Sequence, residues 1–196
     1  MFTLRSPFIL AFSILVPAFA QAQMPAPVIW IQTSLGDIAV ELNQEKAPIT
    51  VANFLRYVGE KHFDGTVIYR VEHGFVLQLG SYDAAGNRRP SPHDAIALEA
   101  NNGLKNLRGS ISMARNDEPA SATTEFFINL ADNPALDPLP TDTENKTGYA
   151  VFGRVISGIE IVDKIAAVPV GGNGPFPGKG PVTPITINRI ATASQP

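Results

Sequence analysis

Residues 67–79 read VIYRVEHGFVLQL, and this stretch decides the fold. Apolar residues dominate Val67–Val71 and Phe75–Leu79, with the polar residues Glu72, His73 and Gly74 between them. Short runs of this composition on either side of a glycine-containing turn predict two strands of a β-hairpin. This stretch therefore predicts that the chain is a mainly β-protein.

Two further runs, SISMAR at 110–115 and EFFINL at 125–130, have the same strand-like pattern. Together with residues 67–79 they supply two guanidinium groups, those of Arg70 and Arg115, several aromatic or aliphatic side chains and few other polar groups. The chain contains no Cys, and it offers no plausible Ser-His-Asp set. Such a surface suits an apolar, uncharged ligand with a hydrogen-bonding backbone, such as a proline-containing peptide.

The first residues have the pattern of an export signal. Arg5 is the only charged residue before an uncharged run from Pro7 to Ala20, and small residues at 18, 20 and 22 fit a cleavage site after Ala20 or Ala22. A membrane anchor is the alternative, but a spanning helix needs about 20 apolar residues and this run is shorter and contains Pro17. We expect a signal peptide at residues 1–22, a periplasmic or secreted protein, and no stable membrane insertion after cleavage.

The rest of the chain, residues 28–193, has the length of one domain. The chain has 15 Lys and Arg residues and 18 Asp and Glu residues, so its net charge is slightly negative. It contains no run of basic residues that would indicate a nucleic-acid partner. The His residues at 62, 73 and 93 lack metal-ligand spacing. We therefore expect no metal, no cofactor and no nucleic acid, and we expect the mature chain to act as a monomer.

Short strands outnumber helices along this domain. A helix is predicted from Pro48 to Gly59, with Thr50 as its cap, and a second from Ile159 to Ala166. Residues 168–184 are rich in Gly and Pro and are expected to be irregular. The pattern predicts a mainly β barrel or sandwich, whose other strands are expected at Val28–Thr33, Asp37–Leu42, Ile96–Glu99, Ser110–Arg115, Phe126–Leu130, Ala150–Ile156 and Ile185–Ala191.

The order of these segments resembles the cyclophilin family of peptidyl-prolyl cis-trans isomerases. Residues 63–71 (FDGTVIYRV), the NNGL of 101–104 followed by RGS at 108–110, and GYAVFG at 148–153 carry the resemblance, and they are particularly similar to the exported bacterial branch. The family implies a closed antiparallel eight-stranded barrel with two capping helices. It also implies isomerisation of Xaa-Pro bonds in proline-containing polypeptides, without a cofactor.

The resemblance also implies which residues form the site. Arg70 takes the place of the family's catalytic arginine, and Gln78 takes the place of the glutamine that contacts the substrate backbone. Ala114 and Arg115 fall on the backbone-binding pair. The proline pocket and its rim fall on Phe75, Val76, Met113, Phe127, Leu136 and Tyr149.

Several positions depart from the family pattern. Tyr69 stands where a His is usual, Val76 where Met is usual, and Leu79 where the first of two glycines is usual. Glu125 replaces the Gln that normally precedes the two phenylalanines, and we include it among the substrate-binding residues. Ala135 replaces an aromatic residue, so a cyclosporin-like ligand is expected to bind poorly.

These departures leave two functions open. Arg70 suits a catalyst that stabilises the twisted amide, because its rigid N–H donors stay charged at any working pH. Glu125 either pairs with Arg70 and orients it, or occupies its donors and weakens it. The alternative to an isomerase is therefore a module that binds proline-containing segments with reduced or lost catalysis.

Overall fold

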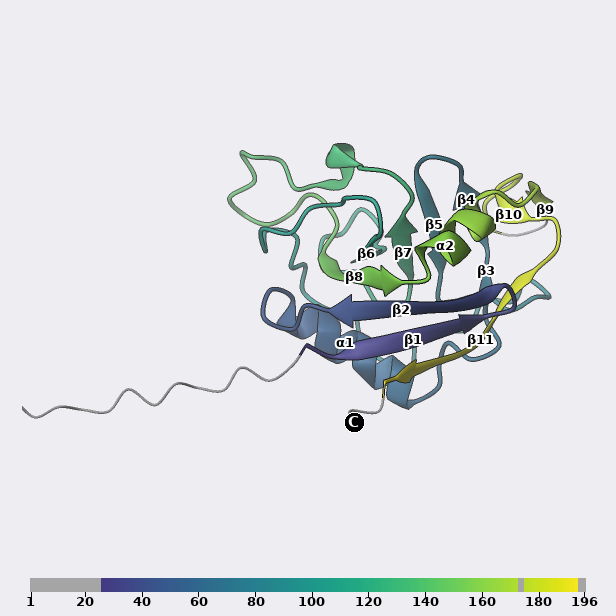
Figure 1. Ribbon diagram of the computed structural model, residues 1–196. Coiled ribbons are helices and arrows are strands. Elements are labelled where there is room, and N and C mark those ends of the chain that lie inside the picture. The colour runs from purple at the N-terminus through teal and green to yellow at the C-terminus, as the bar shows by residue number, and fades with distance from the viewer. Residues whose placement is uncertain (1–25, 173–174, 194–196) are drawn as a thin grey trace, which may run out of the picture.

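The computed structural model describes residues 26–172 and 175–193, and these form a β-barrel with two α-helices (Figure 1). The signal peptide expected at residues 1–22 lies outside the described residues. The elements in chain order are β1 (Val28–Thr33), β2 (Gly36–Leu42), α1 (Pro48–Gly59), β3 (Val67–Ile68), β4 (Arg70–Glu72), β5 (Val76–Leu79), β6 (Ser110–Met113), β7 (Phe126–Asn129), a 3-10 turn (Pro134–Leu136), β8 (Val151–Ser157), α2 (Ile159–Ala166), β9 (Val170–Gly172), β10 (Gly180–Pro181) and β11 (Ile185–Thr192).

The main sheet closes on itself through one interrupted strand. Its order is β3-β11-β1-β2-β8-β6-β7-β5-β4, and its neighbouring strands pair antiparallel. The first and last members, β3 and β4, are consecutive in the chain and are separated only by Tyr69, whose backbone N–H donates to the Gln78 carbonyl at 3.2 Å. Counting β3 and β4 as one strand gives the predicted eight-stranded barrel.

The two helices contact different strands of the sheet, α2 the strand β2 and α1 the strand β11. A Cβ on Gly36, at the start of β2, would meet the Ile161 side chain of α2 at 2.6 Å, while α1 follows the end of β2. Phe54 of α1 lies 5.1–5.3 Å, ring centroid to ring centroid, from Phe63, Phe126 and Phe152. The apolar side of α1 is therefore a core face, and both helices occur where the sequence predicts them.

The predicted cap of α1 was wrong. Ala47 occupies the N-cap position without a side-chain hydrogen bond. Instead the carboxylate of Glu99 accepts hydrogen bonds from the backbone N–H groups of Ile49 at 3.1 Å and Thr50 at 2.8 Å, and from the Thr50 hydroxyl at 2.7 Å. A carboxylate from a distant loop thus satisfies the free donors of the first helical turn.

Two other expectations need correction. The predicted strand Ile96–Glu99 is reduced to an isolated bridge between Ile96 and Ala122, because Glu99 is turned toward α1. The irregular stretch 168–184 contains a short antiparallel ribbon, β9 with β10. Among residues 26–172 and 175–193, no helix is long and apolar enough to cross a membrane.

Candidate functional site

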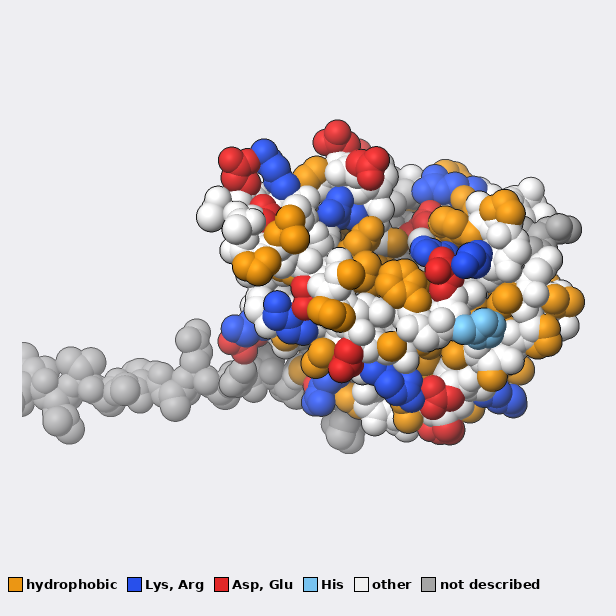
Figure 2. All heavy atoms as spheres, turned by 90° about the horizontal axis from the view of Figure 1, so that it is seen from above, with side chains coloured by type: hydrophobic (Ala, Val, Ile, Leu, Met, Phe, Trp, Pro, Cys, Tyr) orange, Lys and Arg blue, Asp and Glu red, His pale blue; other side chains and the backbone are white. Residues whose placement is uncertain are grey.

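A depression of about 230 Å³ lies over the β4–β5–β7 side of the barrel. Figure 2 shows this face from above, with a hollow where hydrophobic side chains gather and charged groups stand at the edge. All the predicted site residues except Met113 and Glu125 line the depression. The lining is Arg70, Phe75, Val76, Gln78, Ala114, Arg115, Phe127, Leu136, Tyr149 and Phe176.

The apolar wall is held in place by the strand pairing and by side-chain amides. Val76 and Phe127 lie on the adjacent strands β5 and β7, and the Tyr149 ring meets the Phe127 ring edge-on at 5.6 Å. The Phe75 carbonyl accepts from the Leu130 backbone N–H and from the Asn133 side chain, each at 2.9 Å. Met113 lies behind this wall with 2% of its surface exposed, so its contribution is to packing under the pocket.

Arg70 lies at one side of this wall and is held by two partners. Its Nε and Nη2 donate to one carboxylate oxygen of Glu72, and its Nη1 donates to the Gln78 side-chain oxygen at 2.9 Å. A guanidinium carries five N–H donors. Within the part of the chain that the structure describes, these three bonds leave two donors of Arg70 for a ligand. The hydrogen bond from Arg70, assisted by the charge of nearby Lys179, holds the pKa of Glu72 below its ordinary value. Glu72 is therefore an ionised anchor for Arg70.

Glu125 does not pair with Arg70. It therefore neither orients the guanidinium by direct contact nor occupies its donors. Its Oε2 accepts from the Tyr69 hydroxyl at 2.7 Å and from the Gln78 side-chain nitrogen at 3.2 Å, and its Oε1 lies 3.3 Å from Arg88. Because an ionised carboxylate only accepts hydrogen bonds, it draws the Gln78 amide nitrogen toward itself. The Gln78 oxygen is thereby turned toward Arg70.

Tyr69 is the buried partner of this carboxylate. Only 3% of Tyr69 is exposed, and burial, followed by the charge of Glu125, raises the pKa of its hydroxyl. The phenol therefore stays protonated and donates. A chain of hydrogen bonds runs from Tyr69 through Glu125 and Gln78 to Arg70.

Leu79 leaves the site unobstructed. Its side chain is 1% exposed and belongs to the core on the other face of β5. The next residue, Gly80, has a φ of 120°, and a Cβ there would meet the Thr124 carbonyl oxygen at 2.5 Å. A glycine is needed at position 80, whereas position 79 accepts a large apolar side chain.

Ala114 and Arg115 differ in what they offer a ligand. The Ala114 backbone N–H already donates to the Glu125 carbonyl at 2.8 Å, so only its carbonyl oxygen can serve a bound peptide. Arg115 donates from Nε to the Gly148 carbonyl at 2.9 Å, and its Cζ lies 5.2 Å from the centre of the Tyr149 ring. It therefore ties the loop that carries Tyr149 to the edge of the site.

Two residues at the site were missed by the sequence analysis. Glu72 was expected in the turn between two strands, where a charged residue is unremarkable, but it is the last residue of β4 and pairs with Val76 of β5. Phe176 lies in the Gly- and Pro-rich stretch, where no periodicity marks a buried face. Neither position carries a sequence signal that would have identified it.

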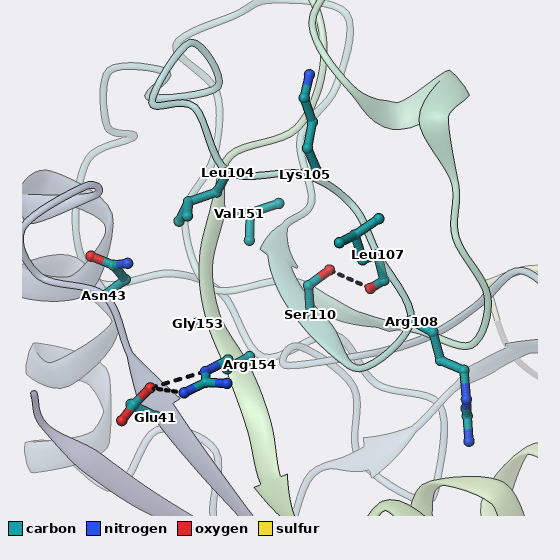
Figure 3. A pocket seen from close by; sticks show the side chains of 10 residues that line it. All are labelled: Glu41, Asn43, Leu104, Lys105, Leu107, Arg108, Ser110, Val151, Gly153 and Arg154. Atoms are coloured by element: carbon teal, nitrogen blue, oxygen red, sulfur yellow. Dashed lines mark hydrogen bonds and ion pairs between the residues drawn. The ribbon is translucent and has the colours of Figure 1, made fainter.

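A second depression, of about 260 Å³, lies over β2, β8 and the loop before β6 (Figure 3). None of the predicted site residues lines it. Its cations face carboxylates: Arg154 lies 2.9 Å from Glu41, and Arg108 lies 2.9 Å from Asp163. Both guanidinium groups bind a carboxylate, as Arg70 does, but this depression lacks the aromatic side chains that lie beside Arg70, namely Phe75, Phe127 and Tyr149.

Comparison with known proteins is consistent with this geometry. The family model described as cyclophilin type peptidyl-prolyl cis-trans isomerase/CLD matches residues 28–192. Peptidyl-prolyl cis-trans isomerase A of Dickeya dadantii (strain 3937) is 41% identical over 179 residues, covering 91% of this chain and 90% of that protein. Peptidyl-prolyl cis-trans isomerase B of Escherichia coli (strain K12) is 41% identical over 147 residues, covering 75% and 88%.

A solved structure has the same fold. The crystal structure of a cyclophilin type peptidyl-prolyl cis-trans isomerase of Cryptosporidium parvum, determined in the presence of the dipeptide Ala-Pro, superposes with a TM-score of 0.73. It is 25% identical in sequence, and the match covers 86% of this chain and 99% of that one.

Proposed function

The chain belongs to the cyclophilin-type family of peptidyl-prolyl cis-trans isomerases, and on that premise we propose that Arg70 is its catalytic residue. We also propose that the substrates of the protein are exported polypeptides. The chain catalyses cis-trans isomerisation of Xaa-Pro bonds. The observation that carries the residue assignment is the Arg70 guanidinium, which lies beside an apolar wall and keeps two donors for a ligand.

The chemistry requires no nucleophile. Resonance gives the amide C–N bond a rotational barrier of about 18–20 kcal/mol, and at proline the cis and trans forms are nearly equal in free energy. A catalyst must therefore bind the twisted amide more tightly than either planar form. In the twisted amide the proline nitrogen regains a lone pair, and a fixed N–H of Arg70 donates to it.

The surrounding residues make that donation selective. The wall of Phe75, Val76 and Phe127 holds the proline ring and keeps water from the guanidinium, which strengthens the donor. Glu72 and Gln78 fix the guanidinium plane, so little reorganisation is needed as the amide twists. Glu125 acts through Gln78 and is a positioning residue.

The substrates that we propose are proline-containing polypeptides. Support comes from the apolar wall beside a donor and from the Cryptosporidium parvum relative, which was crystallised with Ala-Pro. The competing function, a binding module without catalysis, depended on Glu125 and Leu79. Glu125 does not bind Arg70, and Leu79 is buried in the core, so no observation favours that alternative.

We further propose that the chain is exported, that residues 1–22 are a cleaved signal, and that the mature protein is a periplasmic or secreted monomer. The support is the uncharged run after Arg5 and the small residues that follow it. N-terminal sequencing of the exported protein should start at Gln21 or Gln23, and retention of Met1 would contradict cleavage. Sedimentation of the mature chain should give one protomer.

Kinetics with variants of Arg70 test the assignment. We expect Arg70→Ala to lower kcat/KM for Xaa-Pro peptides by about a hundredfold, the scale of losing a transition-state donor. Arg70→Lys should recover only part of this, because an ammonium lacks the guanidinium fork. Arg154→Ala, which removes an exposed ion-paired arginine from the second depression, is the matched control. Full activity in Arg70→Ala would refute the mechanism.

A further inference from the structure

Phe176 brings an aromatic face to the Arg70 end of the depression. The centre of its ring lies 4.8 Å from the Arg70 Cζ, so the ring covers one face of the guanidinium. The ring also lies parallel to that of Tyr69, at 6.1 Å and 11°. Phe176 is only half-buried and lines the depression, so part of its apolar surface faces the space that a substrate enters.

The segment that carries Phe176 is fastened to β4. The Lys179 backbone N–H donates to the Phe176 carbonyl at 3.0 Å, and the Lys179 carbonyl accepts from the Val71 backbone N–H at 2.8 Å. The Lys179 ammonium lies 3.5 Å from Glu72, the anchor of Arg70. Prolines on both sides of Phe176 restrict the backbone further. The ring is therefore presented at a fixed place.

The sheet order places this ring opposite the Ala114 end of the site. β7 and β5 lie between β6, which Ala114 follows, and β4, which carries Arg70. A peptide that puts its proline ring against the wall of β5 and β7 and its backbone near the Ala114 carbonyl must extend over Arg70 on the other side. The side chain next to the proline then reaches Phe176.

We propose that Phe176 forms a subsite for the residue adjacent to proline and selects peptides with an apolar, above all aromatic, side chain there. The inference rests on the proposed function, because it assumes that the proline ring occupies the wall beside Arg70. An aromatic side chain of the substrate can stack on the free part of the Phe176 ring. A small side chain leaves that part in water.

Two peptide series test the subsite, one varying the residue before proline and one varying the residue after it through Gly, Ala, Leu and Phe. Isomerisation by the mature chain is measured for the wild type, Phe176→Ala and Phe176→Tyr. Val182→Ala is the control, since Val182 is a 59% exposed apolar residue of the same stretch that does not line the depression.

Phe176 contacts the residue on only one side of the proline, so we expect one of the two series to respond. In that series, Phe176→Ala should lower kcat/KM by about three- to tenfold for the peptides with Leu or Phe at the varied position. The Gly peptide should change by less than about twofold, and Phe176→Tyr should keep the wild-type preference. An equal loss for all peptides would mean that the ring only supports Arg70, and no loss would mean that substrates do not reach it. Either result overturns the subsite.

The proposed function fails separately, if the wild type accelerates none of the peptides or if Arg70→Ala stays active. In the first case, dissociation constants from NMR titration of the same peptides replace the rates. Loss of the Leu and Phe preference in Phe176→Ala would still support the subsite, and an unchanged preference would refute it.

Discussion

Replacing Glu125 by Gln tests whether the carboxylate positions Gln78 or weakens Arg70. The Oε2 of Glu125 accepts from the Tyr69 hydroxyl at 2.7 Å and from the Gln78 nitrogen at 3.2 Å. A Gln carbonyl oxygen in the same place can accept both bonds, but without the charge. Hydrogen bonds to charged groups contribute about 1.5–3 kcal/mol and neutral ones about 0.5–1.5 kcal/mol. Since Glu125 is partly exposed, we expect the free energy of unfolding to fall by about 1–2 kcal/mol.

The same substitution should barely change catalysis. Because Glu125 does not contact Arg70 and the Gln variant can keep Gln78 in place, we expect kcat/KM to change by less than about threefold. Glu125→Ala removes the acceptor, which frees the Gln78 amide to turn its nitrogen toward Arg70. Loss of the 2.9 Å bond from Arg70 to Gln78 then costs about 1 kcal/mol of positioning, or about fivefold in kcat/KM.

Exchange NMR on an Xaa-Pro peptide measures the rates, and urea denaturation of the same variants measures stability. Arg88→Ala is a matched control, because it removes the exposed partner of Glu125 and leaves the bonds to Tyr69 and Gln78. A gain of tenfold or more in Glu125→Gln would show that the carboxylate lowers the donor strength of Arg70, and the positioning argument would be wrong.

Two further predictions concern stability. Glu99→Ala removes the acceptor of the Ile49 and Thr50 donors, and urea denaturation should show a loss of about 1–2 kcal/mol, as for a deleted helix cap; an unchanged midpoint would show that water replaces the carboxylate without cost. Burial, followed by the charge of Arg89, lowers the pKa of His62 from its ordinary value of 6.5. The folded state therefore favours neutral His62, so its contribution to stability is complete above about pH 6.5 and declines at lower pH; His62→Phe should flatten that decline, and an identical pH profile would contradict the assignment.

The sequence pattern predicts a mainly β-protein because its strands are short, apolar and separated by turn residues, and the resemblance to a family selects the closed barrel over a sandwich. It fails where a side chain far away in the chain decides the outcome. Residues 96–99 have strand composition, yet Glu99 is drawn to the donors of α1, a pairing between positions 49 residues apart. Thr50 has the residue type of a cap, but type alone does not place it at the N-cap position.

The site residues on regular strands could be predicted from the sequence, and those that depend on distant contacts could not. The residues on the strands of the barrel were located by their resemblance to a family, because regular pairing fixes which side chains share a face. Phe176 was missed because its stretch has no period, and its position follows from contacts of Lys179 with β4. Whether Glu125 would bind Arg70 could not be settled either, since that depends on competition among hydrogen-bonding groups from three different segments.

Two departures from the family pattern, Tyr69 and Glu125, are hydrogen-bonded to each other. A Tyr in place of His at position 69 supplies a buried hydroxyl, and a Glu in place of Gln at position 125 supplies the carboxylate that accepts from it at 2.7 Å. Tyr69 without Glu125 would donate only to a neutral acceptor, and Glu125 without Tyr69 would lose its shortest hydrogen bond. A double-mutant cycle with Tyr69→Phe and Glu125→Gln should therefore show a coupling of about 1–2 kcal/mol in the free energy of unfolding. Effects that add within about 0.5 kcal/mol would mean that the two residues are independent, and that Glu125 is retained for Gln78 alone.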